Sequence, residues 1–97
     1  MSQFMVEFSL ANMDEVFMAK VPAQRAKINE LMEQGHILSY SLAADRSKLW
    51  CIVNADSELD VMEIIAQFPL IDYMKPDISE LMFNNVVSLR VPMFSLN

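Results

Sequence analysis

The feature that most constrains the fold is the order in which strand-like and helix-like hydrophobic patterns follow one another along the chain. Apolar residues alternate with others over residues 3–10, 37–44 and 48–55, which is the two-residue repeat of a β-strand. Helical spacing predominates between the first and second of these strands and again after the third. With a last strand predicted at 78–84, the order is β-α-β-β-α-β. This order predicts an α+β, ferredoxin-like domain with two helices on one face of a four-stranded antiparallel sheet.

Residues with strong positional preferences predict the limits of the first helix. Asn12 or Asp14 can cap its N-terminus, since their side chains accept hydrogen bonds from the first backbone N–H groups. Gly35, the only glycine of the chain, is placed to end the helix in the left-handed conformation. Pro22 lies between them and would remove a helical hydrogen bond. We therefore expect a kink or a restart there, with Pro22 in a first turn.

Short polar segments predict the second helix and a hairpin. Ser57, followed by Asp60, is typical of a helix start, and Phe68 with Pro69 stops this helix. The residues expected to form its inward stripe are Leu59, Met62, Ile65 and Ala66. Residues 45–47 form a short polar connection that suits a hairpin between the second and third strands.

Apolar residues on both faces of the predicted strands require a second covering layer. In the strand at 48–55, Trp50 and Ile52 share one face, while Leu49 and Cys51 share the other. Apolar residues make up 54% of the 97 residues, and a domain of this size leaves much of its surface exposed. Two helices can cover only one face of the sheet. We therefore expect the second face to pack against the sheet of another copy, which predicts a homodimer or a higher homo-oligomer.

Length and charge exclude several classes of protein. Ninety-seven residues supply one core, so residues 1–97 are predicted to form a single domain in which 91–97 is an apolar C-terminal extension. A formal net charge of −6 argues against nucleic acid as a partner. No apolar run approaches the length of a membrane span, and one cysteine cannot form an internal disulfide, so we expect a cytoplasmic protein without a membrane partner. One histidine and one cysteine also predict no metal site.

A segment in the middle of the chain resembles the muconolactone delta-isomerase family. The resemblance covers residues 35–74, and its most specific part is Phe68-Pro69-Leu70 followed by Tyr73-Met74, after the second helix. It implies a dimeric α+β barrel that needs no cofactor. It also implies that the protein binds a small unsaturated acid or lactone in an apolar pocket between sheet and helices, and that as an enzyme it would isomerise this ligand. The strand at residues 36–42 is apolar and hydroxylic, where family enzymes carry charged side chains. This motivates an alternative, a non-catalytic oligomeric ligand-binding or scaffold module of the same fold.

Two residues are candidates for moving a proton. His36 is the only imidazole of the chain and titrates near neutrality, so it is the default general base. The alternative for His36 is a structural role at the C-terminal end of the first helix. Glu80 would act as a base if it pointed into a closed apolar cavity, and would have no chemical role at a solvated sheet edge.

Five further residues are candidates for binding the ligand. Arg46, in the predicted hairpin turn, or Arg25, on the first helix, could hold a substrate carboxylate. Tyr40, Trp50 and Tyr73 are amphipathic rings that could shape an apolar pocket and donate one hydrogen bond each. The alternative for each arginine is a solvated surface position, and for the rings it is ordinary core packing.

The C-terminal extension yields a test of assembly. We expect Phe94 and Leu96 to dock on a neighbouring subunit, because this apolar segment follows the last predicted strand. Deleting residues 91–97 should then lower the mass measured by light scattering. Removing Asn97 alone is the control and should leave the mass of the oligomer as it was. An unchanged oligomer after the longer deletion would contradict the prediction.

Overall fold

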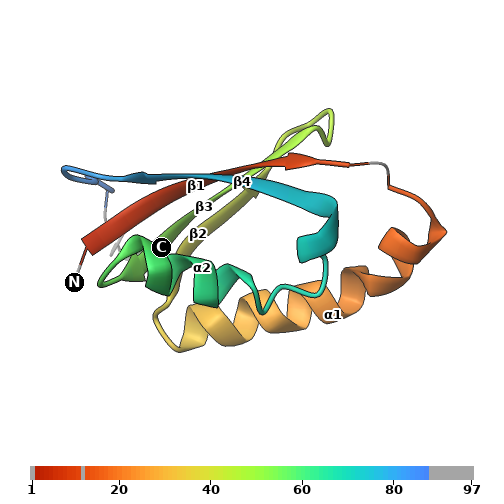
Figure 1. Ribbon diagram of the computed structural model, residues 1–97, viewed down its shortest axis with the longest axis horizontal. Coiled ribbons are helices and arrows are strands. Elements are labelled where there is room, and N and C mark those ends of the chain that lie inside the picture. The colour runs from red at the N-terminus through yellow and green to blue at the C-terminus, as the bar shows by residue number, and fades with distance from the viewer. Residues whose placement is uncertain (1, 12, 88–97) are drawn as a thin grey trace, which may run out of the picture.

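The computed structural model describes residues 2–11 and 13–87 as a four-stranded sheet with two α-helices (Figure 1). The chain order is β-α-β-β-α-β, which confirms the predicted ferredoxin-like α+β fold. A single 3₁₀ turn, Ile71–Tyr73, precedes the last strand. The main elements are β1 (Ser2–Leu10), α1 (Glu15–Glu33), β2 (Ile37–Leu42), β3 (Lys48–Ala55), α2 (Glu58–Ile65) and β4 (Met74–Glu80).

The sheet has the strand order β2-β3-β1-β4, and every neighbouring pair is antiparallel. β1 lies in the interior of the sheet, where Phe4 pairs with Val53 of β3 on one side and with Glu80 of β4 on the other. Figure 1 shows both helices on the same side of this sheet. One sheet face is therefore covered by helices, and no helix among residues 2–11 and 13–87 covers the other, which we call the uncovered sheet face.

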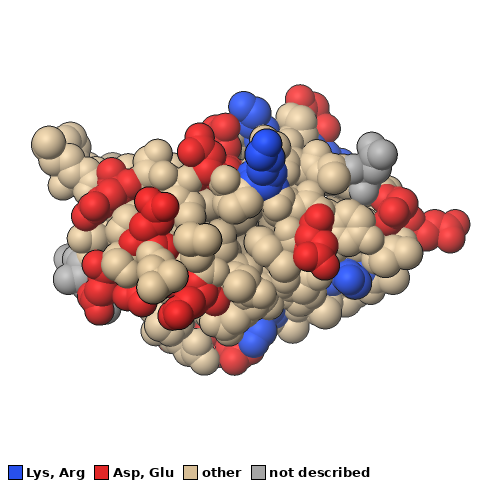
Figure 2. Space-filling view, viewed as in Figure 1, with Lys and Arg blue, Asp and Glu red and all other residues tan. Residues whose placement is uncertain are grey.

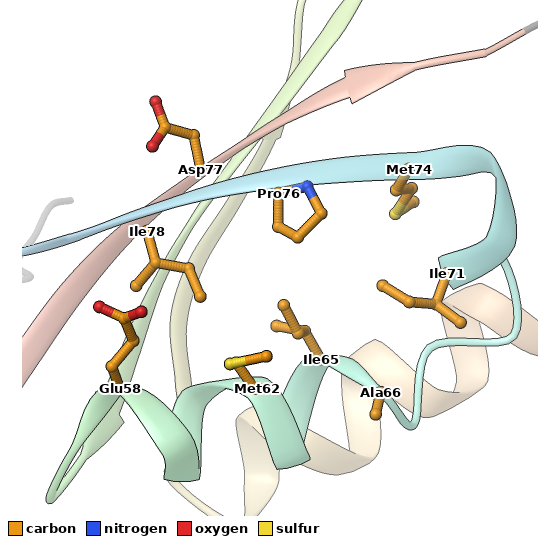
Figure 3. A pocket seen from close by; sticks show the side chains of 9 residues that line it. All are labelled: Glu58, Met62, Ile65, Ala66, Ile71, Met74, Pro76, Asp77 and Ile78. Carbon is orange, nitrogen blue, oxygen red and sulfur yellow. The ribbon is translucent and has the colours of Figure 1, made fainter.

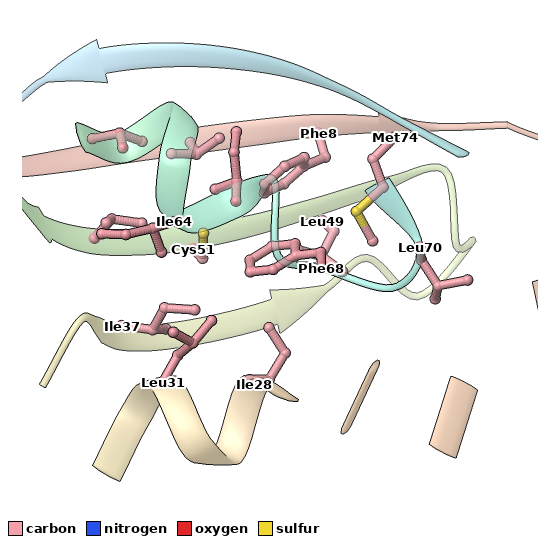
Figure 4. Packing of buried hydrophobic residues seen from close by; sticks show 14 of the residues in the cluster. Phe8, Ile28, Leu31, Ile37, Leu49, Cys51, Ile64, Phe68, Leu70 and Met74 are labelled. Atoms are coloured by element: carbon pink, nitrogen blue, oxygen red, sulfur yellow. The ribbon is translucent and has the colours of Figure 1, made fainter. Parts of the chain in front are cut away.

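The core lies between the covered sheet face and the helices (Figure 4). Val6 and Phe8 of β1 are fully buried, as are Cys51 and Val53 of β3. The ring of Phe68, in the segment after α2, packs against Phe8 with ring centroids 5.8 Å apart. Burying an aromatic side chain of this kind stabilises the fold by about 1.5–3 kcal/mol. Alternate residues of the two central strands thus supply one wall of the core.

Both predicted ends of α1 are confirmed. The Asp14 carboxylate accepts a hydrogen bond of 2.8 Å from the Phe17 N–H and caps the N-terminus. Gly35 has φ 81°, and the N–H groups of Gly35 and His36 donate to the carbonyls of Met32 and Leu31 at 3.0 and 2.9 Å. This pair of bonds is a Schellman motif, which requires a residue in the left-handed conformation.

The expected restart at Pro22 is wrong. α1 continues through Pro22, which lies seven residues after Glu15 and not in a first turn. Pro22 is solvent-exposed, while Phe17 on one side of it and Gln24 on the other are both buried against the rest of the protein. Packing on both sides of the proline offsets the lost hydrogen bond and holds the helix in one piece.

The Ser57 cap of α2 is confirmed, and so is the burial of Ile65. The rest of the expected stripe is wrong, because Leu59, Met62 and Ala66 are exposed and the helix buries Val61 and Ile64 beside Ile65. An apolar sequence offers more than one possible stripe, and the following segment decides between them. Phe68 must reach the core, which turns the face that carries Val61 and Ile64 inward.

β4 begins and ends four residues earlier than the predicted 78–84. The observed strand includes Pro76, and β4 lies at the edge of the sheet, where it pairs with β1 alone. An edge strand tolerates proline, since a missing N–H on its outer side breaks no ladder bond. The C-terminal extension at 91–97, with Phe94 and Leu96, lies outside the described residues.

The uncovered sheet face combines apolar and polar side chains. Trp50 and Ile52 of β3 lie on it, as predicted, beside Met5 and Glu7 of β1. The Glu7 carboxylate accepts hydrogen bonds from Trp50 Nε1 at 2.9 Å and from Lys48 Nζ at 3.3 Å. The Trp50 bond, followed by the bond and the charge of Lys48, lowers the pKa of Glu7 from its ordinary value of 4.5. This face therefore carries a polar cluster within an apolar surround.

The Glu7–Trp50 contact gives a fluorescence test, because Trp50 is the only tryptophan. Because the pKa of Glu7 in the folded protein is below 4.5, Glu7 is ionised and the contact is complete above pH 4.5. The contact is lost as the pH falls through this lowered pKa and Glu7 is protonated. The emission of Trp50 should therefore change with a midpoint below pH 4.5, while far-UV circular dichroism stays constant. Glu7→Gln keeps an acceptor oxygen without a titrating group, and this variant should show no such step. A midpoint at or above 4.5 would contradict the assignment.

Candidate functional site

A cleft of about 270 Å³ opens between α1 and the β2–β3 hairpin, and we call it the α1–hairpin cleft. Its volume is near the lower end of the range for ligand pockets, which suits a small molecule. Most of its lining is aliphatic, aromatic or thioether. The lining residues are Leu10, Met13, Phe17, Met18, Val21, Gln24, Arg25, Tyr40, Leu42, Arg46, Leu49, Leu70 and Met74.

Three of the five predicted binding residues converge on this cleft from different elements. Arg25 comes from α1, Tyr40 from β2 and Arg46 from the turn of the hairpin. Both arginines are exposed at the cleft, and Tyr40 is half-buried. Neither guanidinium forms a salt bridge with a described residue. The cleft thus has apolar walls, two unpaired cations and a phenol, a combination that suits a small organic anion.

The hairpin turn holds Arg46 in an unusual backbone conformation. Arg46 has φ 64°, in the left-handed region that favours glycine, and its N–H donates to the Ala43 carbonyl at 2.9 Å. Asp45 Oδ1 accepts from the Ser47 hydroxyl at 2.7 Å and from the Ser47 N–H at 2.9 Å. These two bonds lower the pKa of Asp45, with the hydroxyl bond the larger cause. An arginine in this conformation carries strain that a glycine would not.

A buried glutamine, which the sequence analysis did not single out, ties the cleft together. Gln24 is 3% exposed, Oε1 accepts a hydrogen bond of 3.1 Å from the Leu70 N–H, and Nε2 donates to Tyr40 Oη at 3.0 Å. One side chain therefore connects α1 to β2 and to the segment after α2. Its spacing was an available signal, because Gln24 follows Phe17 by seven residues and precedes Ile28 by four, on the buried face.

Tyr40 is held near the cleft in its neutral form. Burial raises the pKa of Tyr40, the Gln24 hydrogen bond lowers it in part, and Cys51, which pairs with Tyr40 across the β2–β3 ladder, raises it. Tyr40 therefore presents an O–H group at neutral pH rather than a phenolate.

The other two predicted aromatic residues do not line the α1–hairpin cleft. The Tyr73 ring lies against Phe17, a cleft residue, with centroids 5.3 Å apart and planes at 89°, so it supports the cleft wall. Lys20 Nζ lies 5.9 Å from the centroid of the Tyr73 ring. Burial, followed by the Asp14 and Asp72 carboxylates, raises the pKa of Tyr73. Trp50 is on the uncovered face, where it contacts Glu7.

The two predicted proton-transfer residues lie apart from each other and from the cleft. His36 precedes the edge strand β2, and Glu80 ends β4 at the opposite edge, which places them about 14 Å apart across three strand spacings. Glu80 is exposed. His36 lines a separate depression with Asp56, Asp60 and Glu63. The described residues thus bring no carboxylate or imidazole into the lining of the α1–hairpin cleft.

A larger and more open depression, of about 540 Å³, lies between α2 and β4 (Figure 3). Its floor is apolar and includes Met62, Ile65 and Ile78. Glu58 lies at one end, the Asp77 carboxylate lies on the side of β4 away from α2, and no cation of the described residues lines the depression. Figure 2 shows acidic side chains gathered at the end of the molecule that holds the start of α2, while Lys and Arg lie away from it. An anionic ligand is therefore favoured at the α1–hairpin cleft and disfavoured here.

Cys51 lies in the hydrophobic core and does not line the α1–hairpin cleft. Burial raises the pKa of Cys51 to about 12, so the thiol stays protonated and unreactive at neutral pH. The part of the chain that the structure describes holds no group of three or more His, Cys, Asp or Glu side chains placed to bind a metal. Over residues 2–11 and 13–87, no helix is both long and apolar enough to cross a membrane.

Fold and cleft together define a ferredoxin-like α+β protein with a small apolar cleft flanked by cations. The family model for muconolactone delta-isomerase matches residues 2–83, which includes all four strands and both helices. The chain belongs to the muconolactone delta-isomerase family. A search of curated proteins finds no sequence that matches it.

The Gln24 bridge predicts a measurable contribution to stability. Gln24→Leu leaves the buried Leu70 N–H and Tyr40 without this partner, which should lower the free energy of unfolding by about 1–3 kcal/mol. Gln34→Leu changes an exposed glutamine at the end of the same helix and should stay within about 0.5 kcal/mol of the parent protein. Urea denaturation followed by circular dichroism measures both variants. Equal effects in the two variants would contradict the assignment.

Proposed function

We propose that the protein binds a small unsaturated acid or lactone in the α1–hairpin cleft. The observation that carries the proposal is the convergence of Arg25, Tyr40 and Arg46 on one apolar cleft. The apolar walls would take the carbon skeleton, the two guanidinium groups would hold a carboxylate, and the Tyr40 O–H would bind a second oxygen. Membership of the muconolactone delta-isomerase family supports this class of ligand. No metal or cofactor is required for binding of this kind.

Isomerisation of that ligand would need a proton acceptor in addition to these groups. Moving a proton between two carbons requires a base within hydrogen-bond reach of the substrate. The described lining of the cleft holds none, and His36 and Glu80 lie elsewhere in the same chain. We therefore propose that any isomerase activity depends on assembly, with a second copy bringing a base such as His36 or Glu80 to the cleft. Self-association through the uncovered sheet face, as in a dimeric α+β barrel, is part of this proposal, and because that face is opposite the cleft, the base would have to reach the cleft around the hairpin edge of the sheet.

The absence of a base from the described cleft lining favours a second candidate function. A protein that binds the ligand without turnover, as an oligomeric sensor or scaffold module, needs only the apolar walls, the cations and Tyr40. Proton exchange separates the two functions. An isomerase incubated with the ligand in D₂O should incorporate deuterium at the carbons involved, as seen by nuclear magnetic resonance. A protein that only binds should leave those positions unlabelled.

Arg46 gives a test in which stability and binding move in opposite directions. Arg46→Gly removes the strain at φ 64° and should raise the free energy of unfolding by about 1 kcal/mol. The same variant loses a carboxylate-binding group, so its affinity for a five-membered lactone with an acetic acid arm should fall about tenfold. Isothermal titration calorimetry and urea denaturation measure the two effects.

Two controls make this result specific. Lys75→Ala removes a cation that lies outside the α1–hairpin cleft, and it should leave the affinity unchanged. Arg46→Lys keeps the charge but not the forked geometry, so its affinity should fall less than that of Arg46→Gly. An affinity that Arg46→Gly and Arg25→Ala both leave unchanged would place the carboxylate elsewhere and reject the proposed site.

A further inference from the structure

The hydrogen bonds of Gln24 leave one possible orientation for its amide. The Leu70 N–H can only donate, so the atom 3.1 Å away from it must be the carbonyl oxygen Oε1. The amide nitrogen Nε2 then faces Tyr40 Oη at 3.0 Å. Gln24 is 3% exposed, so solvent offers no competing partner to either end of the amide. The backbone of the segment after α2 thereby sets which group of Gln24 meets Tyr40.

This orientation determines where the hydroxyl hydrogen of Tyr40 can point. The amide group at Nε2 has two N–H donors and no acceptor. Tyr40 Oη must therefore accept the hydrogen bond from Gln24. The Tyr40 hydrogen must therefore point away from Gln24. Among the described residues, no group accepts a hydrogen bond from it, and the Tyr40 side chain lines the α1–hairpin cleft. The O–H group is thus available to a molecule in the cleft.

We infer that Gln24 holds Tyr40 as an obligate hydrogen-bond donor toward the α1–hairpin cleft, so that the site selects ligands with a carbonyl or carboxylate oxygen at Tyr40. This inference rests on the proposed function for its ligand, and on the Leu70–Gln24–Tyr40 contacts for the direction of the bond. Gln24 is a positioning residue, because it acts through Tyr40. The lactone carbonyl oxygen can only accept a hydrogen bond and so pairs with the Tyr40 O–H, whereas a group that can only donate would leave the Tyr40 hydrogen unpaired.

The direction of the Gln24–Tyr40 bond can be tested without a ligand. A donor to Oη stabilises the phenolate, so Gln24→Met should raise the pKa of Tyr40, measured by ultraviolet titration. If Tyr40 instead donated to Gln24, the same variant would lower this pKa. Tyr40→Phe identifies which step of the ultraviolet titration belongs to Tyr40, because only the Tyr73 step remains in this variant. The ionisable groups around Tyr40 are Cys51 on β3 and the two arginines of the cleft, and all are kept in these variants.

The selectivity is tested with two ligands that differ in one oxygen. The first is the five-membered lactone with an acetic acid arm, and the second is the matching cyclic ether acid, which lacks only the carbonyl oxygen. The wild-type protein should bind the lactone about 10–100-fold more tightly than the ether, as expected when a donor is left unpaired. Tyr40→Phe should abolish this preference, because it removes the hydrogen-bond donor from the cleft.

Gln24→Glu tests positioning rather than packing. When the introduced carboxylate is ionised it accepts from Tyr40, which turns the Tyr40 hydrogen inward and removes the lactone preference. When the pH is lowered and the carboxyl group is protonated, it can donate to Tyr40 as the amide does, and the preference should return. The wild-type preference should show no such pH dependence, and circular dichroism confirms that each variant is folded.

The possible failures are distinguishable. A fall in the pKa of Tyr40 in Gln24→Met, or equal wild-type affinities for lactone and ether, would overturn the inference while leaving the binding function intact. A wild-type protein that binds neither ligand would reject the proposed function and with it the ligand selectivity. In that case the ultraviolet titration would still report the direction of the Gln24–Tyr40 bond.

Discussion

The pairing of β1 on both sides is the constraint on which the rest of the structure depends. β1 joins β3 and β4, so Phe4, Val6 and Phe8 project from the middle of the sheet into the space under the helices. A shift of one residue in either ladder would turn these three side chains to the uncovered face. Phe68 packs against Phe8 of this row, and α2 buries its apolar residues against β3, which the pairing with β1 holds beside it. The register of β1 thus determines where the core and the helices lie.

The same arrangement separates the molecule into two ends with different chemistry. The end near the α2 N-terminus holds Asp56, Asp60 and Glu63 around His36. The hairpin end holds Arg25 and Arg46 beside an apolar cleft. Along β3, Leu49 at the cleft and Asn54 at the acidic end are five residues apart, or about 17 Å at about 3.3 Å per residue. A net charge of −6 therefore coexists with a local site suited to an anion.

Sequence patterns predicted the fold because its main signals are local. The Asp14 and Ser57 caps and the left-handed Gly35 depend on neighbouring residues alone, and the structure confirms all three. The errors fall where distant packing overrides local preference. Pro22 stays inside α1, and α2 turns a different stripe inward, because buried partners elsewhere in the chain determine both.

The candidate site could be predicted only in part for the same reason. Arg25, Tyr40 and Arg46 were chosen for their chemistry, and the antiparallel hairpin brings them to one cleft. Gln24 was missed because a polar residue inside a helix looks solvent-exposed until its partners are known. Those partners, Tyr40 and the Leu70 backbone, are 16 and 46 residues away in sequence.

Pro76 in β4 has a consequence for how copies of this protein can meet. β4 is an open edge of the sheet, and such edges recruit strands from other molecules into aggregates. Pro76 lacks the N–H that an added strand would need, and the neighbouring Lys75 and Asp77 place charges along the same edge. Continuous growth of the sheet through β4 is thereby discouraged. Association through the faces of the sheet instead depends on side-chain complementarity rather than on backbone pairing.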